Sequence, residues 1–587
     1  AGYNDNFGMI LNGTASLKYN FKYVKGLTAK YLINYYEDQS DVKNYSRPVD
    51  LYTYDVLSGI YTLRASLGSA AQMEVSHSLS RKFMTQASLN YDNRFGTDHA
   101  LSALALFETI DYYSNWLSAS RDGFITPAIE QLFGGSTDTM KNNGSANEMG
   151  RMSAVGRVNY SFKDRYLIET TFRADASAKF SPRRRWGFFP SVSLGWRISE
   201  EPWMEGTKDV LDALKLRASY GQSGNDGVVN FQYLSGYQLG GYYLLGSESR
   251  KGLLSTGMAN PDLTWEEISI YDAGLEWSFL NRAFYGEIDG FYRTRNGIPG
   301  TRLHTLPSTF GASLPQENIN SLNNRGFELS LGSSKTFGKF SYDINANLSW
   351  SRAKWDHYEE QEYEDPDEIR LYKRSGQWVD RTIGYKTDGL FTSQAEIDAL
   401  PYDQDNKGNT SLRPGTVKIV DVNGDGKIDW KDQVEIGKGT MPHWMTGVSI
   451  DLRYGDFDLS ALFQGAFGYS TNIGFESISK DYFDLRWTEE NNDKWAQPRI
   501  GAGSTGDFNL KQAGYLRLKQ LTFGYNLPKS LCEKLALQRC RLYLAGTNLL
   551  TFDKLSKFHV DPEAPSGANT RYYPQQKTVS VGLNVSF

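Results

Sequence analysis

The sequence predicts an all-β protein, and more narrowly a transmembrane antiparallel β-barrel with long loops on one side. Three observations predict this fold: alternation of apolar and polar residues, segments long enough to cross a bilayer, and connections of two very different lengths. The clearest segment is 578–587, where every second residue from Val579 to Phe587 is apolar and those between are small or polar. Because successive side chains of a strand point to opposite faces, one face is apolar and the other polar. A barrel strand with lipid outside and a wet lumen inside has this pattern.

The same alternation returns along nearly the whole chain, which argues against the alternative of an edge strand in a soluble sandwich. Residues 447–454 alternate, and after a short turn residues 457–463 resume the apolar phase. Segments of about nine to eleven residues or more exceed the usual soluble strand and suit a tilted strand that crosses a bilayer. Further alternating segments lie at 15–21, 27–33, 152–162, 166–175, 192–198, 214–220 and 342–350.

The predicted connections fall into two classes. Short ones lie at 24–26, 280–282, 335–339 and 454–456. Long ones lie at about 38–72, 110–148, 223–262, 297–321, 355–380 and 466–512. Short turns on the periplasmic side and long loops on the outer side are typical of an outer-membrane barrel, and compact soluble domains seldom hold so many long loops.

Composition agrees with a single all-β unit. The 587 residues contain no linker or charge block that divides them, and no apolar run long enough for a transmembrane helix or a signal peptide. The 37 Tyr, 31 Phe and 13 Trp fall often near strand ends, where aromatic girdles of a barrel lie. A net charge of −5 without a basic stripe makes nucleic acid an unexpected partner.

Cysteine and histidine usage gives no sign of catalysis. Cys532 and Cys540 lie eight apart around a predicted periplasmic turn, which allows either a disulfide or two unpaired thiols but fits no metal spacing. The six histidines are scattered, and the metalloprotease, serine-hydrolase and phosphate-loop motifs are missing. We therefore expect no enzyme, although a barrel lipase or protease is formally open.

Residues 421–432 follow the spacing of a calcium-binding loop. Gly426 at position 6 permits the sharp turn, and hard oxygen donors suit a divalent cation. Position 12 is Asp rather than Glu, and the flanks are not two helices. We expect a structural Ca²⁺ or Mg²⁺ here, and the alternative is a cluster of Asx turns without metal. The predicted ligands are Asp421, Asn423, Asp425, the Lys427 carbonyl, Asp429 and Asp432.

Several segments together resemble the SusC (RagA-like) family of TonB-dependent outer-membrane transporters. They include Phe-Arg-Ala-Asp-Ala-Ser-Ala-Lys-Phe at 172–180 and Asn-Pro-Asp-Leu-Thr-Trp-Glu at 260–266. The others lie in the same order at 156–166, 186–190, 216–225, 324–328, 384–391, 421–436, 515–518, 546–550 and 561–563. Each match alone is weak, but the ordered series is specific.

The resemblance implies a barrel of 22 strands preceded by an amino-terminal plug. We count about 16 to 18 candidate strands, the first residues already alternate like a barrel strand, and no segment resembles a plug. We therefore expect residues 1–587 to form the carboxy-terminal part of the barrel, in the outer membrane of a Gram-negative bacterium and in contact with its lipid.

The resemblance also implies a function. We expect TonB-dependent import of oligosaccharides together with a SusD-like surface lipoprotein that acts as a lid, in a dimer of such pairs. The TonB complex would act through the missing amino-terminal part. Oligopeptide import is the runner-up. A lidless receptor for an iron chelate or corrinoid and a non-transporting adhesin are two further candidates.

Aromatic residues on the long loops are the candidates for substrate contact. Their rings can stack on sugars or contact peptides, although packing within a loop or contact with the lid is the alternative for each. The candidates are Tyr52, Tyr54, Trp116, Tyr242, Tyr243, Trp355, Tyr363 and Trp378.

Overall fold

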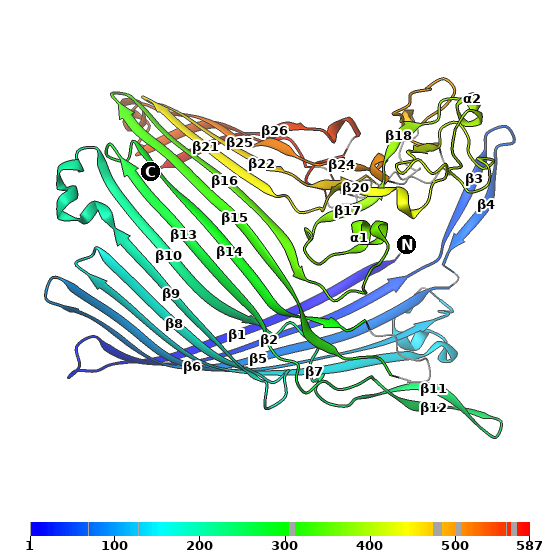
Figure 1. Cartoon of the computed structure of the whole chain (residues 1–587), viewed down its shortest axis with the longest axis horizontal. Helices are drawn as coiled ribbons and strands as arrows, with labels where there is room; N and C mark the ends of the chain where they lie inside the picture. Colours follow the sequence, from blue (N-terminus) through cyan, green and yellow to red (C-terminus); the bar gives the residue numbers. More distant parts are fainter. Residues whose placement is uncertain are drawn as a thin grey trace. The chain divides into compact units, whose positions relative to one another are not determined.

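The chain forms two compact units that consist mainly of antiparallel strands (Figure 1). The computed structural model describes residues 2–68, 70–126, 128–303, 312–473, 484–499, 506–558, 560–564, 572–573 and 575–587. Unit 1 comprises Ala1–Val192, Gly221–Glu267 and Leu306–Asn318, and unit 2 comprises Ser193–Tyr220, Ile268–Thr305 and Ile319–Phe587. No helix in the described part has the length and apolar content that a membrane crossing needs.

Within the described residues, seventeen strands belong to one sheet, in agreement with the predicted number. In unit 1, six long strands pair antiparallel with their neighbours in chain order. They are β1 (Tyr3–Asn20), β2 (Leu27–Ser46), β5 (Gln72–Phe95), β6 (His99–Asp122), β7 (Lys141–Phe162) and β8 (Tyr166–Ser177). Two hairpins form separate two-stranded sheets: β3 (Val49–Asp55) with β4 (Ile60–Leu67), and β11 (Tyr237–Leu245) with β12 (Glu248–Ser255).

Nine further strands of the sheet lie wholly or mostly in unit 2, and those from β21 onwards have 9–15 residues, fewer than the 18–22 residues of β14, β15 and β16. From β15 onwards each pairs antiparallel with the next strand of the sheet. They are β13 (Glu266–Phe279), β14 (Phe284–Thr301), β15 (Gln316–Phe337), β16 (Phe340–His357), β21 (Trp444–Tyr454), β22 (Phe457–Phe467), β25 (Tyr515–Asn526), β26 (Arg539–Asp553) and β27 (Thr578–Ser586). The sheet also contains β9 (Trp186–Arg197) and β10 (Leu211–Asn225).

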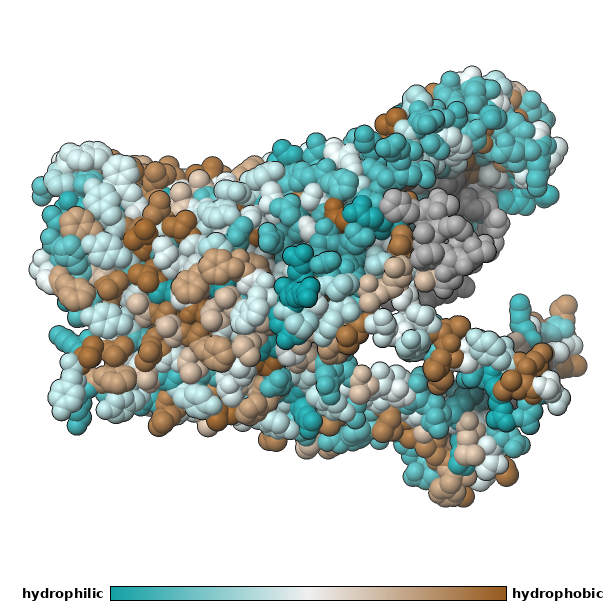
Figure 2. All heavy atoms as spheres, turned by 60° about the horizontal axis from the view of Figure 1, so that its bottom comes forward, coloured by the Kyte–Doolittle hydropathy of each residue, from teal (hydrophilic) through white to brown (hydrophobic). Residues whose placement is uncertain are grey.

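The apolar face of these strands is not buried in a core. In β27, Val579, Val581 and Leu583 are 69%, 76% and 58% exposed. The outward residues of unit 1, such as Leu17 and Phe107, are also exposed. On the forward face in Figure 2, hydrophobic residues gather over the half of the unit 1 strands nearer their short turns. A soluble sandwich would press these side chains together in a dry centre, so that alternative is wrong.

The short turns occur where the sequence predicts them. Gly26 ends the turn between β1 and β2 with φ +87°, a left-handed conformation that favours glycine. Between β13 and β14, three consecutive non-glycine residues from Leu280 to Arg282 have positive φ. Asp212 stabilises this turn by accepting hydrogen bonds from the backbone N–H groups of Asn281 (2.9 Å) and Arg282 (2.8 Å).

Two of the predicted long loops are shorter than expected because the strands continue into them. The loop predicted at 38–72 is strand to Ser46 and carries the β3–β4 hairpin, and the loop predicted at 110–148 is mostly β6 and β7. Beyond the bilayer both faces of a strand meet water, so these extensions carry no apolar alternation to detect. Trp116 accordingly lies within β6 rather than on a loop.

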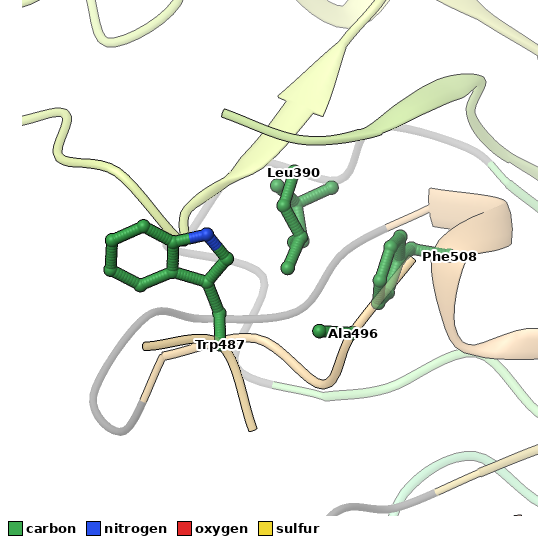
Figure 3. Packing of buried hydrophobic residues seen from close by; sticks show 5 residues of the cluster. Leu390, Trp487, Ala496 and Phe508 are labelled. Carbon is green, nitrogen blue, oxygen red and sulfur yellow. The ribbon is translucent and has the colours of Figure 1, made fainter. Parts of the chain in front are cut away.

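The long connections of unit 2 fold into a small domain-like region, here called the loop lobe (residues 358–443, 484–499 and 506–512). It contains helices α1 (Pro366–Tyr372) and α2 (Gln394–Asp398). It has two two-stranded antiparallel sheets, which pair β17 (Arg381–Tyr385) with β20 (Gln433–Lys438), and β18 (Thr387–Leu390) with β19 (Val417–Ile419). A hydrophobic core in the lobe consists of Leu390, Val417, Trp487, Ala496 and Phe508 (Figure 3).

The two cysteines are free thiols. Cys532 lies in α4 (Lys529–Lys534) and Cys540 in β26, and both side chains are buried. Of the two alternatives that the spacing allows, the structure has the unpaired thiols.

Candidate functional site

A cleft of about 840 Å³ in unit 2 brings together three of the eight predicted aromatic residues, Trp355, Tyr363 and Trp378. It lies where the end of β16 meets the segment that carries α1. Tyr358 and Tyr372 also line it, although neither was predicted from the sequence. The density of aromatic residues between 355 and 378 is the signal that could have identified the whole group.

Local sequence explains why α1 forms at this position. Pro366 occupies the first helical turn, where its missing N–H is not needed. Asp365 is the N-cap, and its side chain accepts a hydrogen bond from the backbone N–H of Asp367 at 2.8 Å. This hydrogen bond, together with the nearby Lys431, holds the pKa of Asp365 below its ordinary value.

Backbone pairing holds the opposite wall of the cleft. The Trp355 N–H donates to the Gln377 carbonyl, and the Gly376 N–H donates to the Trp355 carbonyl, both at 2.9 Å. Gly376 has φ +76°, which permits the tight return. Glu360 accepts hydrogen bonds from the backbone N–H groups of Arg374 (2.7 Å) and Ser375 (3.0 Å). The aromatic residues therefore stand on a fixed backbone although they lie in a long connection.

Several rings of the cleft are already in contact with guanidinium groups or other rings. The guanidinium carbons of Arg352 and Arg325 lie 4.3 Å and 5.3 Å from the centre of the Trp378 ring. Arg374 lies 4.7 Å from the centre of the Tyr358 ring in the same way. Such cation–π contacts stabilise the rings and occupy part of the surface that a sugar would stack on.

Charged side chains of both signs line the cleft. Glu360 and Glu368 supply carboxylates, and Lys373, Arg374 and Arg381 supply cations. Burial, and then the charge of Glu360, raise the pKa of the Tyr363 hydroxyl, so this group is a neutral hydrogen-bond donor at physiological pH. The cleft can therefore bind a polar ligand that carries charges or many hydrogen-bonding groups.

The other five aromatic candidates lie in unit 1 and do not line this cleft. Tyr52 and Tyr54 lie on β3, Tyr242 and Tyr243 on β11, and Trp116 on β6. All five side chains are exposed. Tyr54 packs against Tyr61 across the β3–β4 hairpin, with ring centres 4.7 Å apart. Their role in substrate contact stays a prediction.

The predicted calcium loop is held by hydrogen bonds of its own carboxylates. Asp421 accepts from the backbone N–H groups of Gly424 (2.7 Å) and Gly426 (3.0 Å). Asp432 is fully buried and accepts from the N–H groups of Val422 (2.9 Å) and Asp429 (2.8 Å). Both oxygens of Asp432 are thus engaged by the backbone, and with Asp429 it forms a capping box around a short 3-10 turn.

The remaining predicted ligands also have partners within the loop. The Asn423 amide donates to Asp425 at 3.1 Å, and the Lys427 ammonium lies 2.9 Å from an Asp429 oxygen. This ion pair lowers the pKa of Asp429 and raises the pKa of Lys427. Within the described residues, no three or more Asp, Glu, His or Cys side chains converge as metal ligands would. The donor types suit a hard cation, and without one the carboxylates accept hydrogen bonds from the loop backbone. The metal site therefore stays a prediction.

The loop is connected directly to the cleft through α1. The Arg370 guanidinium donates to the carbonyls of Gln433 (2.6 Å) and Lys431 (2.9 Å), which follow Trp430. Tyr372, which lines the cleft, stacks on Trp430 with ring centres 5.9 Å apart. The conformation of residues 421–432 therefore helps to position one wall of the cleft.

Segments that carry the family resemblance meet in structural clusters away from the cleft. In unit 1, Phe180, Phe189, Leu263 and Trp265 come from three such segments and form one hydrophobic cluster. Beside it, buried Asp226 accepts hydrogen bonds from Arg151 and Ser177. In unit 2, a nearly buried arginine, Arg517, pairs with Asp561 (2.9 Å) and with Glu563. These motifs hold connecting segments against the sheet. They therefore indicate the fold of the protein and do not indicate which substrate it binds.

Comparison with known proteins identifies the family. Residues 1–549 match the family model "TonB dependent receptor-like, beta-barrel". SusC of Bacteroides thetaiotaomicron, a TonB-dependent receptor, is 29% identical over 467 residues, which is 74% of this chain and 44% of SusC. TonB-dependent receptor P3 of Formosa agariphila is 27% identical over 564 residues, or 90% of this chain and 54% of that protein.

Solved structures agree on the fold. The RagAB peptide importer in its open-open state matches with a TM-score of 0.77 and 22% identity, over 100% of this chain and 62% of that one. The closed-closed state matches with a TM-score of 0.76. The chain spans about half the length of the curated relatives that it matches. The chain therefore belongs to the TonB-dependent receptor-like β-barrel family, whose members are receptors of the Gram-negative outer membrane.

Proposed function

We propose that the full-length protein imports an oligomeric nutrient across the outer membrane by a TonB-dependent mechanism. The observation that carries this proposal is the cleft in unit 2, which combines rings with charges of both signs on a fixed backbone. The similarity to SusC over 74% of the chain supports it. A SusD-like surface lipoprotein would close over the extracellular side, the TonB complex would supply the energy, and two such pairs would form a dimer.

For the cargo we retain the oligosaccharide that the family resemblance predicts. Trp355 and Tyr363 are partly exposed in the cleft, and such rings can stack on the apolar face of a sugar. The neighbouring charged groups would accept and donate hydrogen bonds to hydroxyl groups.

An oligopeptide is the second candidate, and one specific observation favours it. Guanidinium groups already contact Trp378 and Tyr358, whereas Glu368 and Lys373 offer opposite charges in the same cleft. A peptide has charged termini and a backbone of donors and acceptors, which such a lining can match. The RagAB structures, which share this fold, are described as those of a peptide importer.

Calorimetry distinguishes the two cargo classes when the full-length protein is titrated with an oligosaccharide and, separately, with an oligopeptide. We expect Trp355→Ala to weaken binding of the preferred class by about tenfold, the loss expected for one aromatic contact of about 1.4 kcal/mol. Trp203→Ala, an exposed tryptophan in the connection between β9 and β10 and outside the cleft, is the matched control. Binding that survives Trp355→Ala, or fails equally with Trp203→Ala, would place the substrate elsewhere.

Uptake experiments test the lidded mechanism and its rivals. Deletion of the gene for the partner lipoprotein should reduce import, and undiminished import would count against a lid. Uptake of an iron chelate or corrinoid without that lipoprotein would support a lidless receptor. Surface attachment in cells that import neither cargo would support an adhesin.

We also propose, from the motif spacing, a structural calcium ion in residues 421–432, which would brace α1 through Lys431 and Gln433. The ion would replace the hydrogen bonds that Asp421 now accepts from Gly424 and Gly426. Calorimetry on chelator-treated protein tests this: heat on adding calcium that Asp421→Ala removes supports the ion. Absence of heat would leave the Asx-turn cluster as the structure of the loop.

A further inference from the structure

An apolar groove of about 610 Å³ crosses the outward face of the first strands of unit 1. The groove exists because four residues along its floor have small side chains. They are Ala29 on β2, Ala87 on β5, Ala105 on β6 and Ala154 on β7. Pairing across the strands brings them into one band: Leu89 lies opposite both Ala29 and Ala105, and Phe107 lies opposite both Ala87 and Ala154. The larger side chains that border the groove are Leu17, Tyr19, Tyr31, Leu89, Phe107 and Phe172.

The groove is continuous with the surface that meets the membrane. Most of its lining residues belong to the apolar phase of each strand. The lining residues of the opposite phase are Lys30, Ser88, Leu106 and Val155. In a barrel of this family the apolar phase faces lipid and the polar phase faces the lumen. Hydrocarbon therefore covers this groove, rather than water.

Its depth in the membrane follows from the short turns. Ala29 lies three residues after Gly26, and Ala154 lies eight residues before the end of β7 at Phe162. With a rise of about 3.3 Å per residue and a tilt of about 45°, these positions lie within about 20 Å of the turns. Short turns face the periplasm, and the hydrocarbon core is about 30 Å thick. The groove thus lies mainly in the periplasmic leaflet, which contains phospholipid.

Two cations without partners lie at the same end of these strands. Lys22 and Lys25 occupy the turn between β1 and β2, and among the described residues neither forms an ion pair. In the neighbouring turns, by contrast, Arg94 pairs with Asp164 at 3.2 Å and Lys163 with Asp98 at 3.8 Å. A lysine at the interface reaches the headgroup region and attracts the phosphate of an anionic lipid.

We propose that a phospholipid of the periplasmic leaflet occupies this site. One acyl chain lies in the groove over Ala87 and Ala105, and the phosphate contacts Lys22 and Lys25. The apolar lining recognises the chain, and the unpaired lysines recognise the headgroup. This binding is independent of the cargo and of the transport mechanism.

Native mass spectrometry of the full-length protein, extracted in mild detergent and incubated with phosphatidylglycerol, an anionic phospholipid, tests the proposal. We expect the parent protein to retain one phospholipid per chain. Ala105→Phe fills the groove and should weaken retention by about tenfold, the equivalent of removing about two methylene contacts. Ala461→Phe, an outward alanine on β22, is the matched control and should retain lipid as the parent does.

A second pair of variants keeps the test decisive if Ala105→Phe fails to fold. Lys22→Ala and Lys25→Ala lie in an exposed turn and should each weaken retention by about fivefold. Unchanged retention in these variants would overturn the proposal, as would a parent protein that retains no phospholipid or retains lipopolysaccharide instead. If Ala105→Phe separates a dimer and leaves lipid content unchanged, a second copy of the chain occupies the groove and the proposal is wrong.

Discussion

The sheet strands expose their apolar residues on the outward face, whereas the loop lobe buries its apolar residues in cores of its own. In the sheet, outward residues such as Val581 and Leu583 are exposed, and no dry centre lies between packed layers of the described strands. In the lobe, Leu390 and Phe391 are fully buried, and its cores gather residues from distant parts of the chain. The two regions therefore fold in different surroundings. The outward apolar residues of the sheet contact lipid, whereas the apolar residues of the lobe are buried away from water by the hydrophobic effect.

A binding site in which distant side chains converge can form in the lobe more readily than in the barrel wall. The wall of a barrel has a regular geometry, because every backbone group must pair within the sheet. The lobe has no such constraint, so Trp355, Tyr363 and Trp378 can converge from a strand end, a loop and a return segment. The candidate site accordingly belongs to the lobe and its junction with β16.

The largest expected effect tests the core of the lobe. Trp487→Ala removes a buried ring that packs with Leu390 and Phe508, and it should destabilise the lobe by about 3–5 kcal/mol. Hydrogen exchange of residues 387–390 and 417–419 measures this as loss of protection. Trp186→Ala, an exposed Trp at the start of β9, is the control. Equal losses of protection from both variants would show that the packing of Trp487 does not specifically stabilise the lobe.

The next effect tests the sheet in the same way. Val581→Arg places a charge on the outward face near the middle of β27 and should cost about 2–4 kcal/mol in a bilayer. Val422→Arg, at an exposed position of the lobe, should cost close to nothing. The folded fraction in lipid vesicles, read from heat-modifiable electrophoretic mobility, measures both. Tolerance of Val581→Arg would mean that this face does not meet lipid.

The sequence could predict the sheet well, but only within the bilayer. Period-two alternation predicted the strands, because lipid on one side and a wet lumen on the other impose it on each residue. It failed beyond the bilayer, as at Trp116, where β6 continues with water on both sides. The turns were predictable from local residues such as Gly26 and Gly455, both of which have positive φ.

The cleft was predictable only in part. Aromatic density selected Trp355, Tyr363 and Trp378, but the contact of Arg352 with Trp378 depends on a return of the chain that no local pattern encodes. The spacing of residues 421–432 predicted donor types, whereas the engagement of Asp432 by Val422 and Asp429 depends on how the loop closes. Local sequence patterns therefore predicted the strands and turns of the sheet. The geometry of the candidate site depends on long-range packing, which these patterns do not encode.

A smaller effect tests the connection within the lobe. Arg370→Ala removes hydrogen bonds to Lys431 and Gln433 and should loosen α1 by about 1 kcal/mol, because the side chain is partly exposed. Hydrogen exchange at Ile369, whose N–H donates to the Asp365 carbonyl at 3.0 Å, measures the change. Lys373→Ala, at the C-cap, is the control and should leave protection unchanged. Unchanged protection in Arg370→Ala would mean that residues 421–432 do not position the cleft.

The smallest effect concerns acid stability of the lobe. Desolvation acts to raise the pKa of Asp405, but hydrogen bonds from Ser411, Lys407 and Asn409 outweigh it and hold this pKa well below the ordinary value. Below pH of about 4 the unfolded chain then binds more protons than the folded one, so the stabilisation is fully present above that pH and is lost as pH falls towards the lowered pKa. Asp405→Asn should flatten this acid-side fall in the lobe's unfolding temperature, and Asp398→Asn on α2 should not. The unfolding temperature of the sheet should fall less over the same range, since its stability depends mainly on outward apolar residues that do not titrate. A parallel fall of lobe and sheet would show that they unfold as one cooperative body, and the distinction between the two regions would then hold for their packing but not for their stability.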